Sequence, residues 1–304
     1  MTYALGRRPP KDAPALHAGR FLRLDTAPAH PTTVDHLSNI RDWALYANDR
    51  FGVCGPAATA NLRKQVTKYL TDHETSPTLA DVFDLYRRSG NPDFDPATGA
   101  DDNGVDLQTM LEAVHAGGIG GTTCLGFAKV DVANLDEVRA SISIFGSLLL
   151  GVNLEVAQQT QTTTGLWDCT PSNVWGGHAV LAGRYSSATR GDDIDVITWA
   201  EIIGTTDAFW ERQVEEAWVV IWPEHLGTAA FQAGVDVAAL ASDYLALTGR
   251  PFPGHVPPQP APSPVDPADQ VLAAALRPWV TEHHVGANHR VQQAAQAWLA
   301  AKGL

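Results

Sequence analysis

The chain has 304 residues, 44% hydrophobic and 18% charged, so it can form a sizeable core and wholesale disorder is excluded. Its formal net charge is −13, and an acidic surface repels phosphate backbones and anionic lipid heads, which argues against nucleic-acid and membrane-surface partners. No apolar stretch is long enough for a membrane span, and no signal peptide is recognisable. Three widely spaced cysteines argue against a disulfide scaffold and against a zinc site, so we expect no metal or other cofactor.

The chain divides into a helical first half and a strand-rich second half. Residues 1–40 are rich in proline and lack helical periodicity, which predicts an extended arm lying along its own domain or a partner. Apolar residues at helical spacing then predict three helices, at Cys54–His73, Thr78–Arg88 and Asp106–His115. After a glycine-rich turn, the pattern predicts short strands at Thr122–Val130, Leu148–Leu154, His178–Tyr185, Asp193–Ala200 and Ala217–Trp222, with one helix at Asn134–Phe145. This segregation indicates an α+β fold with a mostly antiparallel sheet.

Beyond the main body, residues 251–304 predict a second, smaller unit. A helix at Asp236–Leu247 closes the main body, residues 41–250. Residues 251–267 carry eight prolines and predict a semi-rigid linker. Residues 268–304 predict a hairpin of two amphipathic helices, Ala268–Thr281 and Asn288–Lys302. Such a hairpin is too small to form much core alone, so we expect it to dock onto something.

Cys54 is the first candidate for chemistry, because it begins a helix directly after a glycine-containing turn. A helix N-terminus favours the thiolate and lowers the pKa of a cysteine. A small buried residue in a well-formed helix is the structural alternative. On position alone the two interpretations are equally good.

His178 is the second candidate, at the start of an apolar strand and after two glycines, Gly176 and Gly177. Glycines in such a place let another backbone or a substrate approach closely. A lone strand histidine is more often structural, but a cysteine nucleophile needs a base that takes its proton and later returns it. Trp175 and Trp199 flank this histidine and could line a substrate groove and shield the base from water.

The combination of Cys-Gly-Pro-Ala-Ala opening a helix, Gly-Gly-His-Ala-Val opening a strand and a later Val-Ile-Thr-Trp strand resembles the papain-like cysteine peptidases. Both the papain branch and the double-glycine leader peptidase branch share parts of this pattern. The resemblance spans about residues 40–225 and implies a nucleophile helix in a helical half, followed by an antiparallel sheet half. The Gly-Arg-Arg-Pro-Pro arm and the segment Glu215–Leu226 also resemble uncharacterised actinobacteriophage virion proteins.

The resemblance implies Cys54 as the nucleophile and His178 as the base, with the thiol within about 4 Å of an imidazole nitrogen. Asn48 lies six residues before Cys54, where the family keeps a glutamine that helps form the oxyanion hole. The side-chain amide of Asn48 offers the same N–H donors for this role, and the alternative is a turn residue that caps the Asn-Asp-Arg segment.

The family's third residue, an asparagine that orients the histidine, is missing, because Ile197 stands at that position. Alternation along a strand favours Asp195 as the replacement acceptor, with Thr198 second if a bulge redirects it. Either could instead be a solvated strand residue. This departure from the family pattern leaves the third site open.

Two functions follow from these patterns. The first is a cysteine peptidase or amidase that acts by thiolate acyl transfer on peptidoglycan peptides or a virion protein, in the virion tail. The second is a structural virion protein that keeps the papain-like fold with weak or no activity, and whose arm and hairpin contact other virion proteins. Without the virion resemblance, the absence of a signal peptide would indicate a cytoplasmic protein.

Overall fold

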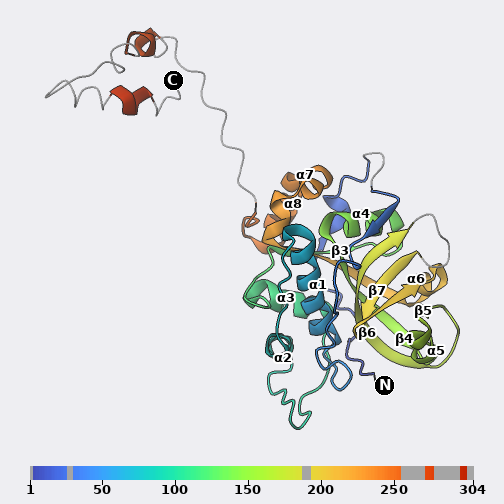
Figure 1. Cartoon of the computed structure of the whole chain (residues 1–304). Coiled ribbons are helices and arrows are strands. Elements are labelled where there is room, and N and C mark those ends of the chain that lie inside the picture. The colour runs from blue at the N-terminus through green and yellow to red at the C-terminus, as the bar shows by residue number, and fades with distance from the viewer. Residues whose placement is uncertain (1–2, 26–29, 187–192, 255–270, 277–294, 300–304) are drawn as a thin grey trace. The chain divides into compact units, whose positions relative to one another are not determined.

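The computed structural model describes residues 3–25, 30–186, 193–254, 271–276 and 295–299 (Figure 1). The chain divides into two units, Met1–His255 and Val256–Leu304. Two helical pieces of the smaller unit are described, 271–276 and 295–299. Most of the proline-rich segment and the rest of the predicted hairpin lie outside the described residues.

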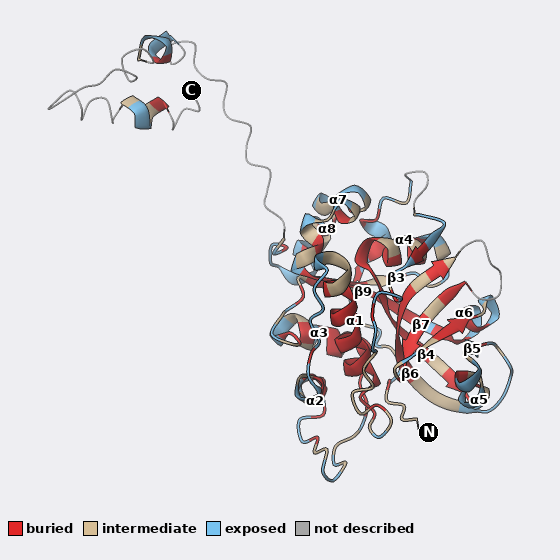
Figure 2. Ribbon diagram, in the orientation of Figure 1, coloured by how far each residue is buried: buried red, intermediate tan, exposed pale blue. Residues whose placement is uncertain are grey.

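The helical half consists of α1 (Cys54–Thr71), α2 (Leu79–Arg88) and α3 (Leu107–Gly117). Two of these helices begin at a side-chain cap, since Thr78 and Asp106 accept hydrogen bonds from the backbone amides three residues on. Helix α1 is buried from its first residue to Thr67 and lies against β6 (Val174–Ser186), as Figure 2 shows. This packing brings the N-terminus of α1 to the sheet.

The strands form one sheet in the order β1-β3-β9-β4-β6-β7-β8-β5, with β2 paired to β6, and β1 and β2 come from the N-terminal arm. The pairs β1/β3 and β5/β8 are parallel and the others are antiparallel. The remaining strands are β1 (Leu16–His17), β2 (Thr33–Asp35), β3 (Gly126–Val130), β4 (Leu148–Glu155), β5 (Leu166–Trp167), β7 (Ile194–Thr198), β8 (Glu201–Thr205) and β9 (Val214–Ile221). The helices outside the first half are α4 (Leu135–Phe145), α5 (Ala157–Thr164), α6 (Asp207–Gln213), α7 (Ala229–Gly234) and α8 (Val237–Thr248), with 3₁₀ turns at Ala18–Arg20 and Pro223–Gly227.

The sheet separates two apolar cores, because successive strand residues point to opposite faces. One core joins α1–α3 to the face that carries Leu149, Leu181 and Trp218. The other core includes Val180 and Phe145 and is covered by α4 and α7. The α+β architecture expected from the sequence is confirmed.

The strand expected at Asp193–Ala200 ends earlier, at Thr198. Trp199 and Ala200 have positive φ angles of 45° and 68°, so the chain turns there and returns directly as β8. The turn lacks the usual glycine or asparagine signal, which is why β8 was not predicted. In the described part of the chain, no helix has the length and apolar character needed to cross a bilayer.

Candidate active site

Cys54 is the first residue of α1, and the turn before it is fixed by side chains of the helical half. The amide of Gly52 donates to Asp102 Oδ1 at 2.9 Å, and the Tyr86 hydroxyl donates to the same oxygen at 2.7 Å. The Tyr86 oxygen in turn accepts from the Gly104 amide at 2.7 Å. The segment around Asp102 therefore positions the turn that precedes Cys54.

His178 is fully buried in β6 beside the turn at Trp199. Its Nε2 lies 2.7 Å from Thr198 Oγ1, and its ring stacks on the Trp199 indole with the centroids 4.2 Å apart. The Nδ1 atom has no hydrogen-bond partner among the described residues. Burial lowers the pKa of His178 to about 3, so the imidazole is neutral near pH 7. The imidazole is therefore neutral and held at Nε2, and its Nδ1 is unpaired among the described residues.

The group that binds His178 is Thr198, and the expected preference for Asp195 is corrected. Ile197 lies opposite Leu181 in the β6–β7 register, so the next residue, Thr198, projects to the other face, which His178 shares. No bulge is needed at this point. Asp195 instead forms an ion pair with Arg184, beyond the register shift between Ala182 and Arg184.

The extended arm passes between the two halves and covers the cysteine. Its backbone pairs with both sides of a groove. The Arg7 amide donates to Gly177 O at 3.1 Å on the sheet side, while Val105 on the helical side donates to Gly6 O and accepts from the Arg8 amide, both at 2.7 Å. Residues 4–8 of the arm therefore lie along the chain's own domain.

Glycines make this approach possible on both sides. A Cβ on Gly177 would lie 2.3 Å from Arg7 O, and one on Gly104 would lie 2.1 Å from Gly6 O. Gly6 itself passes so close to the turn before Cys54 that a Cβ on Gly6 would lie 2.0 Å from Gly52 O. We call the groove lined by Gly52, Gly104 and Gly177 the arm groove.

The thiol of Cys54 is 1% exposed beneath the arm, and burial raises its pKa to about 11. The backbone amides of Gly6, Ala179 and Gly55 interact with the sulfur and oppose this shift, but burial dominates. The lowered pKa expected from the helix N-terminus is therefore wrong for this arrangement of the arm. The thiol forms no hydrogen bond with His178, since Nδ1 of that ring has no partner among the described residues. The residue next to it, Ala179, contacts the sulfur through its backbone amide.

Asn48, the candidate oxyanion donor, is also engaged by the arm. Its Nδ2 donates to Ala4 O at 3.3 Å and to Phe51 O at 3.2 Å, and its own carbonyl accepts from the Ala4 amide at 3.2 Å. The Ala4 carbonyl oxygen therefore accepts the hydrogen bond that Asn48 Nδ2 could donate to another carbonyl. A cavity of about 10 Å³ remains beside Asn48 and Cys54, room for about one water molecule.

The aromatic residues predicted to line the groove lie beside the arm. Tyr3 packs on Trp199 with ring centroids 4.4 Å apart, and on Trp175 at 6.3 Å. Together with the stacked His178, these rings form an apolar wall. Residues Thr162–Gly165 and Glu201–Ile203 line a cavity of about 380 Å³ next to Tyr3 and Trp199.

Arg7 is a buried charged residue beside the candidate site that the sequence analysis did not single out. Its side chain is fully buried and reaches Glu216, Glu215 and Asn153 on β9 and β4. A lone arginine in a proline-rich segment gives no signal of this kind. The motif that could have revealed it is the Glu215-Glu216 pair in an otherwise apolar strand.

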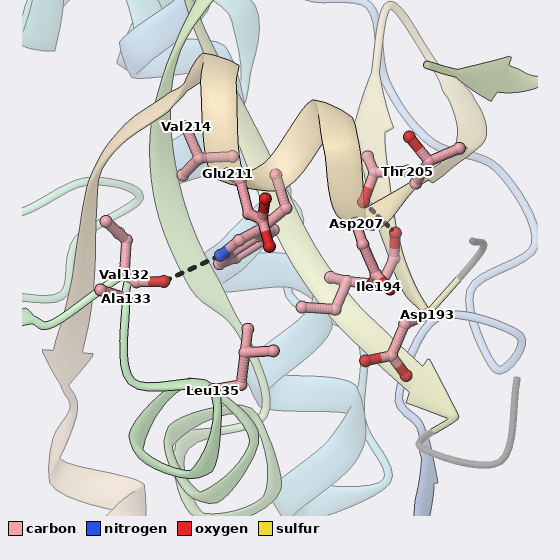
Figure 3. Close-up of a pocket in the computed structure, with 11 residues that line it drawn as sticks. Val132, Ala133, Leu135, Asp193, Ile194, Thr205, Asp207, Glu211 and Val214 are labelled. Atoms are coloured by element: carbon pink, nitrogen blue, oxygen red, sulfur yellow. Dashed lines mark hydrogen bonds between the residues drawn. The ribbon is translucent and has the colours of Figure 1, made fainter. Parts of the chain in front are cut away.

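A separate cavity of about 370 Å³ lies between the β3–α4 loop and α6 (Figure 3). Asp193, Asp207 and Glu211 line it together with apolar residues, and Trp210 donates to Val132 O at 2.9 Å. It contains no cysteine or histidine, so it offers no nucleophile and base. Among the described residues, no cluster of metal-binding side chains is present here or elsewhere.

The structure resembles solved cysteine proteases of low sequence identity. Xylellain, a cysteine protease from Xylella fastidiosa, matches with a TM-score of 0.56 at 12% identity, over 73% of this chain and 97% of that one. Procathepsin B S9 from Trypanosoma congolense matches with a TM-score of 0.53 at 11% identity, over 72% of this chain and 86% of that one. The chain has the papain-like fold. No family model and no curated protein matches it.

Proposed function

We propose that the chain is a cysteine peptidase or amidase that is latent while its arm fills the groove. The observation that carries the proposal is the state of His178. Its Nε2 is fixed by Thr198, its Nδ1 is unpaired, and the next residue, Ala179, touches the sulfur of Cys54. Thiol acyl transfer requires a cysteine and an oriented imidazole that can reach it. Ala179 lies on the face of β6 that contacts the sulfur and the His178 ring lies on the other face, so the proposal requires this ring to turn toward α1 when the arm leaves.

The reaction would use four side chains of the site. With its ring turned toward α1, His178 Nδ1 takes the thiol proton of Cys54, and the thiolate sulfur attacks the amide carbonyl carbon. Asn48 Nδ2 stabilises the oxyanion of the tetrahedral intermediate. The imidazolium, held by Thr198, returns its proton to the departing amine as the C–N bond breaks. Water then attacks the thioester, with His178 as its base, and releases the acid and the free thiol.

Neither reacting group is active while the arm is in place. A thiol with a pKa near 11 and an imidazole with a pKa near 3 exchange no proton at neutral pH. Departure of the arm would expose Cys54 to water, which removes the main cause of the shift in the pKa of its thiol. Latency therefore follows from burial alone.

The setting of the activity is proposed from the sequence resemblance to phage virion proteins. In the tail of a virion, the substrate would be the peptides of peptidoglycan or another virion protein. The arm and the residues 268–304 would contact neighbouring virion proteins. A groove that pairs with backbone on both walls suits an extended peptide.

The second candidate is a structural virion protein with the papain-like fold and no activity. The observation in its favour is that the arm fills the groove with a fully buried arginine and a close backbone fit. A permanent closure of this kind would leave Cys54 without a role in chemistry.

The test uses the full-length chain with Gly6→Leu, because the added side chain clashes with Gly52 O and displaces the arm. This variant should cleave labelled casein or purified peptidoglycan peptides, and the additional change Cys54→Ala or His178→Ala should abolish cleavage. A Gly6→Leu protein whose Cys54 is alkylated quickly, but which cleaves neither substrate, would support the structural alternative.

A further inference from the structure

We propose that the arm groove contains a subsite for a guanidinium group, and that it binds extended peptides carrying an arginine at the position now filled by Arg7. The proposal deepens the proposed function by naming a class of substrate. Its evidence is the side-chain environment of Arg7, which is independent of the chemistry at Cys54.

Every nitrogen of the Arg7 guanidinium has an acceptor in the groove. Nε donates to Glu216 Oε1 at 2.9 Å, and one terminal nitrogen donates to Glu215. The other lies 3.1 Å from Asn153 Oδ1 and 3.5 Å from Val152 O. These acceptors come from two neighbouring strands, β9 and β4. A planar fork of donors fits them, whereas a lysine ammonium could reach only part of the set.

The subsite is acidic and its main carboxylate is held in place. Glu216 has a fully buried side chain, and its Oε2 accepts from Trp218 Nε1 at 2.7 Å. Burial raises the pKa of Glu216, with the nearby Asp106 adding to the shift, while Arg7 opposes it. Without a cation this carboxylate would stay buried and unpaired, which is costly. The groove therefore favours a cationic side chain at this position.

Space for the guanidinium comes from Gly151 on β4. A Cβ at this position would lie 2.5 Å from Arg7 Nε and 2.6 Å from Glu216 Cγ. Any side chain there would close the subsite. The rest of the peptide is held through its backbone by Gly177 and Val105, contacts that do not depend on sequence. Specificity consequently lies in the arginine subsite.

The test measures peptide binding to an opened full-length protein. In a Gly6→Leu, Arg7→Ala, Cys54→Ala variant, neither the steric fit nor the ion pair holds the arm. The probes are the peptide acetyl-Ala-Leu-Gly-Arg-Arg-Pro-amide and the same peptide with citrulline at its fourth position, which keeps the shape but removes the charge. Calorimetry should show binding of the arginine peptide and binding at least roughly thirtyfold weaker for citrulline.

Two matched changes locate the effect. Glu216→Gln should abolish the preference for arginine over citrulline, whereas Glu211→Gln, an exposed carboxylate on α6, should leave it unchanged. The proposal is overturned by equal affinity for the two peptides in the variant that keeps Glu216. It is also overturned by a lack of peptide binding when Cys54 of the Gly6→Leu, Arg7→Ala protein is alkylated rapidly. Arginine-selective binding with no hydrolysis by the Cys54-containing protein would refute the proposed activity and leave the subsite standing.

Discussion

Replacing Arg7 with alanine should uncover Cys54. The change removes a side chain with 0% exposure and leaves Glu216 buried without its cation. Breaking a buried ion pair in this way costs about 3 kcal/mol or more, whereas the half-exposed Glu215 contributes little. Since 1.4 kcal/mol is tenfold, the open fraction of the arm should rise roughly a hundredfold. The cost falls on the closed arm, because the ion pair between Arg7 and Glu216 forms only in that state.

Alkylation by iodoacetamide, resolved by mass spectrometry, measures this opening. When the arm closes faster than the reagent reacts, the rate at Cys54 follows the open fraction. Cys169 is partly exposed and should react equally in all variants, while Cys124, buried in the core, reports global unfolding. Arg8→Ala is the matched control, because the Arg8 side chain is exposed. An Arg7→Ala protein with wild-type reactivity at Cys54 would refute the anchoring argument.

Two further predictions concern the histidines. In the opened protein, Thr198→Val should reduce kcat about tenfold or more, because it leaves the His178 imidazole without its hydrogen bond. Asp195→Asn should reduce kcat less. A larger effect of Asp195→Asn would restore Asp195 as the orienting group. The free energy of unfolding should fall as pH drops from about 6.5 toward 4, because His36, His178 and His225 have lowered pKa values when folded and bind protons on unfolding. Urea denaturation at pH 7 and pH 5 measures this, and His225→Gln should reduce the slope; equal stability at both pH values would contradict it.

The order of elements could be predicted from sequence because helical and strand periodicities each dominate one half of the chain. Helices α1–α4 and α8 begin and end near the predicted residues. The short helices α5–α7 could not be found in this way, since six to eight residues contain too little periodicity. Strand β8 was missed because the turn at Trp199 and Ala200 has no glycine.

Within the site, local sequence located Cys54, His178 and Asn48 but not their electrostatic state. The helix N-terminus does favour a thiolate, yet burial under residues distant in sequence reverses the direction of the shift. The choice between Asp195 and Thr198 failed for a related reason. It depends on which strand residue faces His178, and that is set by the register with β6, a tertiary property.

An arm that belongs to the same chain competes with any substrate on unequal terms. A short tether gives the arm an effective concentration in the millimolar range, so a free peptide with the same contacts would have to exceed it. Most of the arm's contacts are backbone pairs that any extended peptide can reproduce, whereas the Arg7 ion pairs need an arginine. A substrate can therefore displace the arm only if it brings an arginine to the subsite and is presented at high local density. Polymeric or particle-bound substrates meet this condition, and the same argument explains why a dilute peptide assay of the unmodified chain should show no turnover.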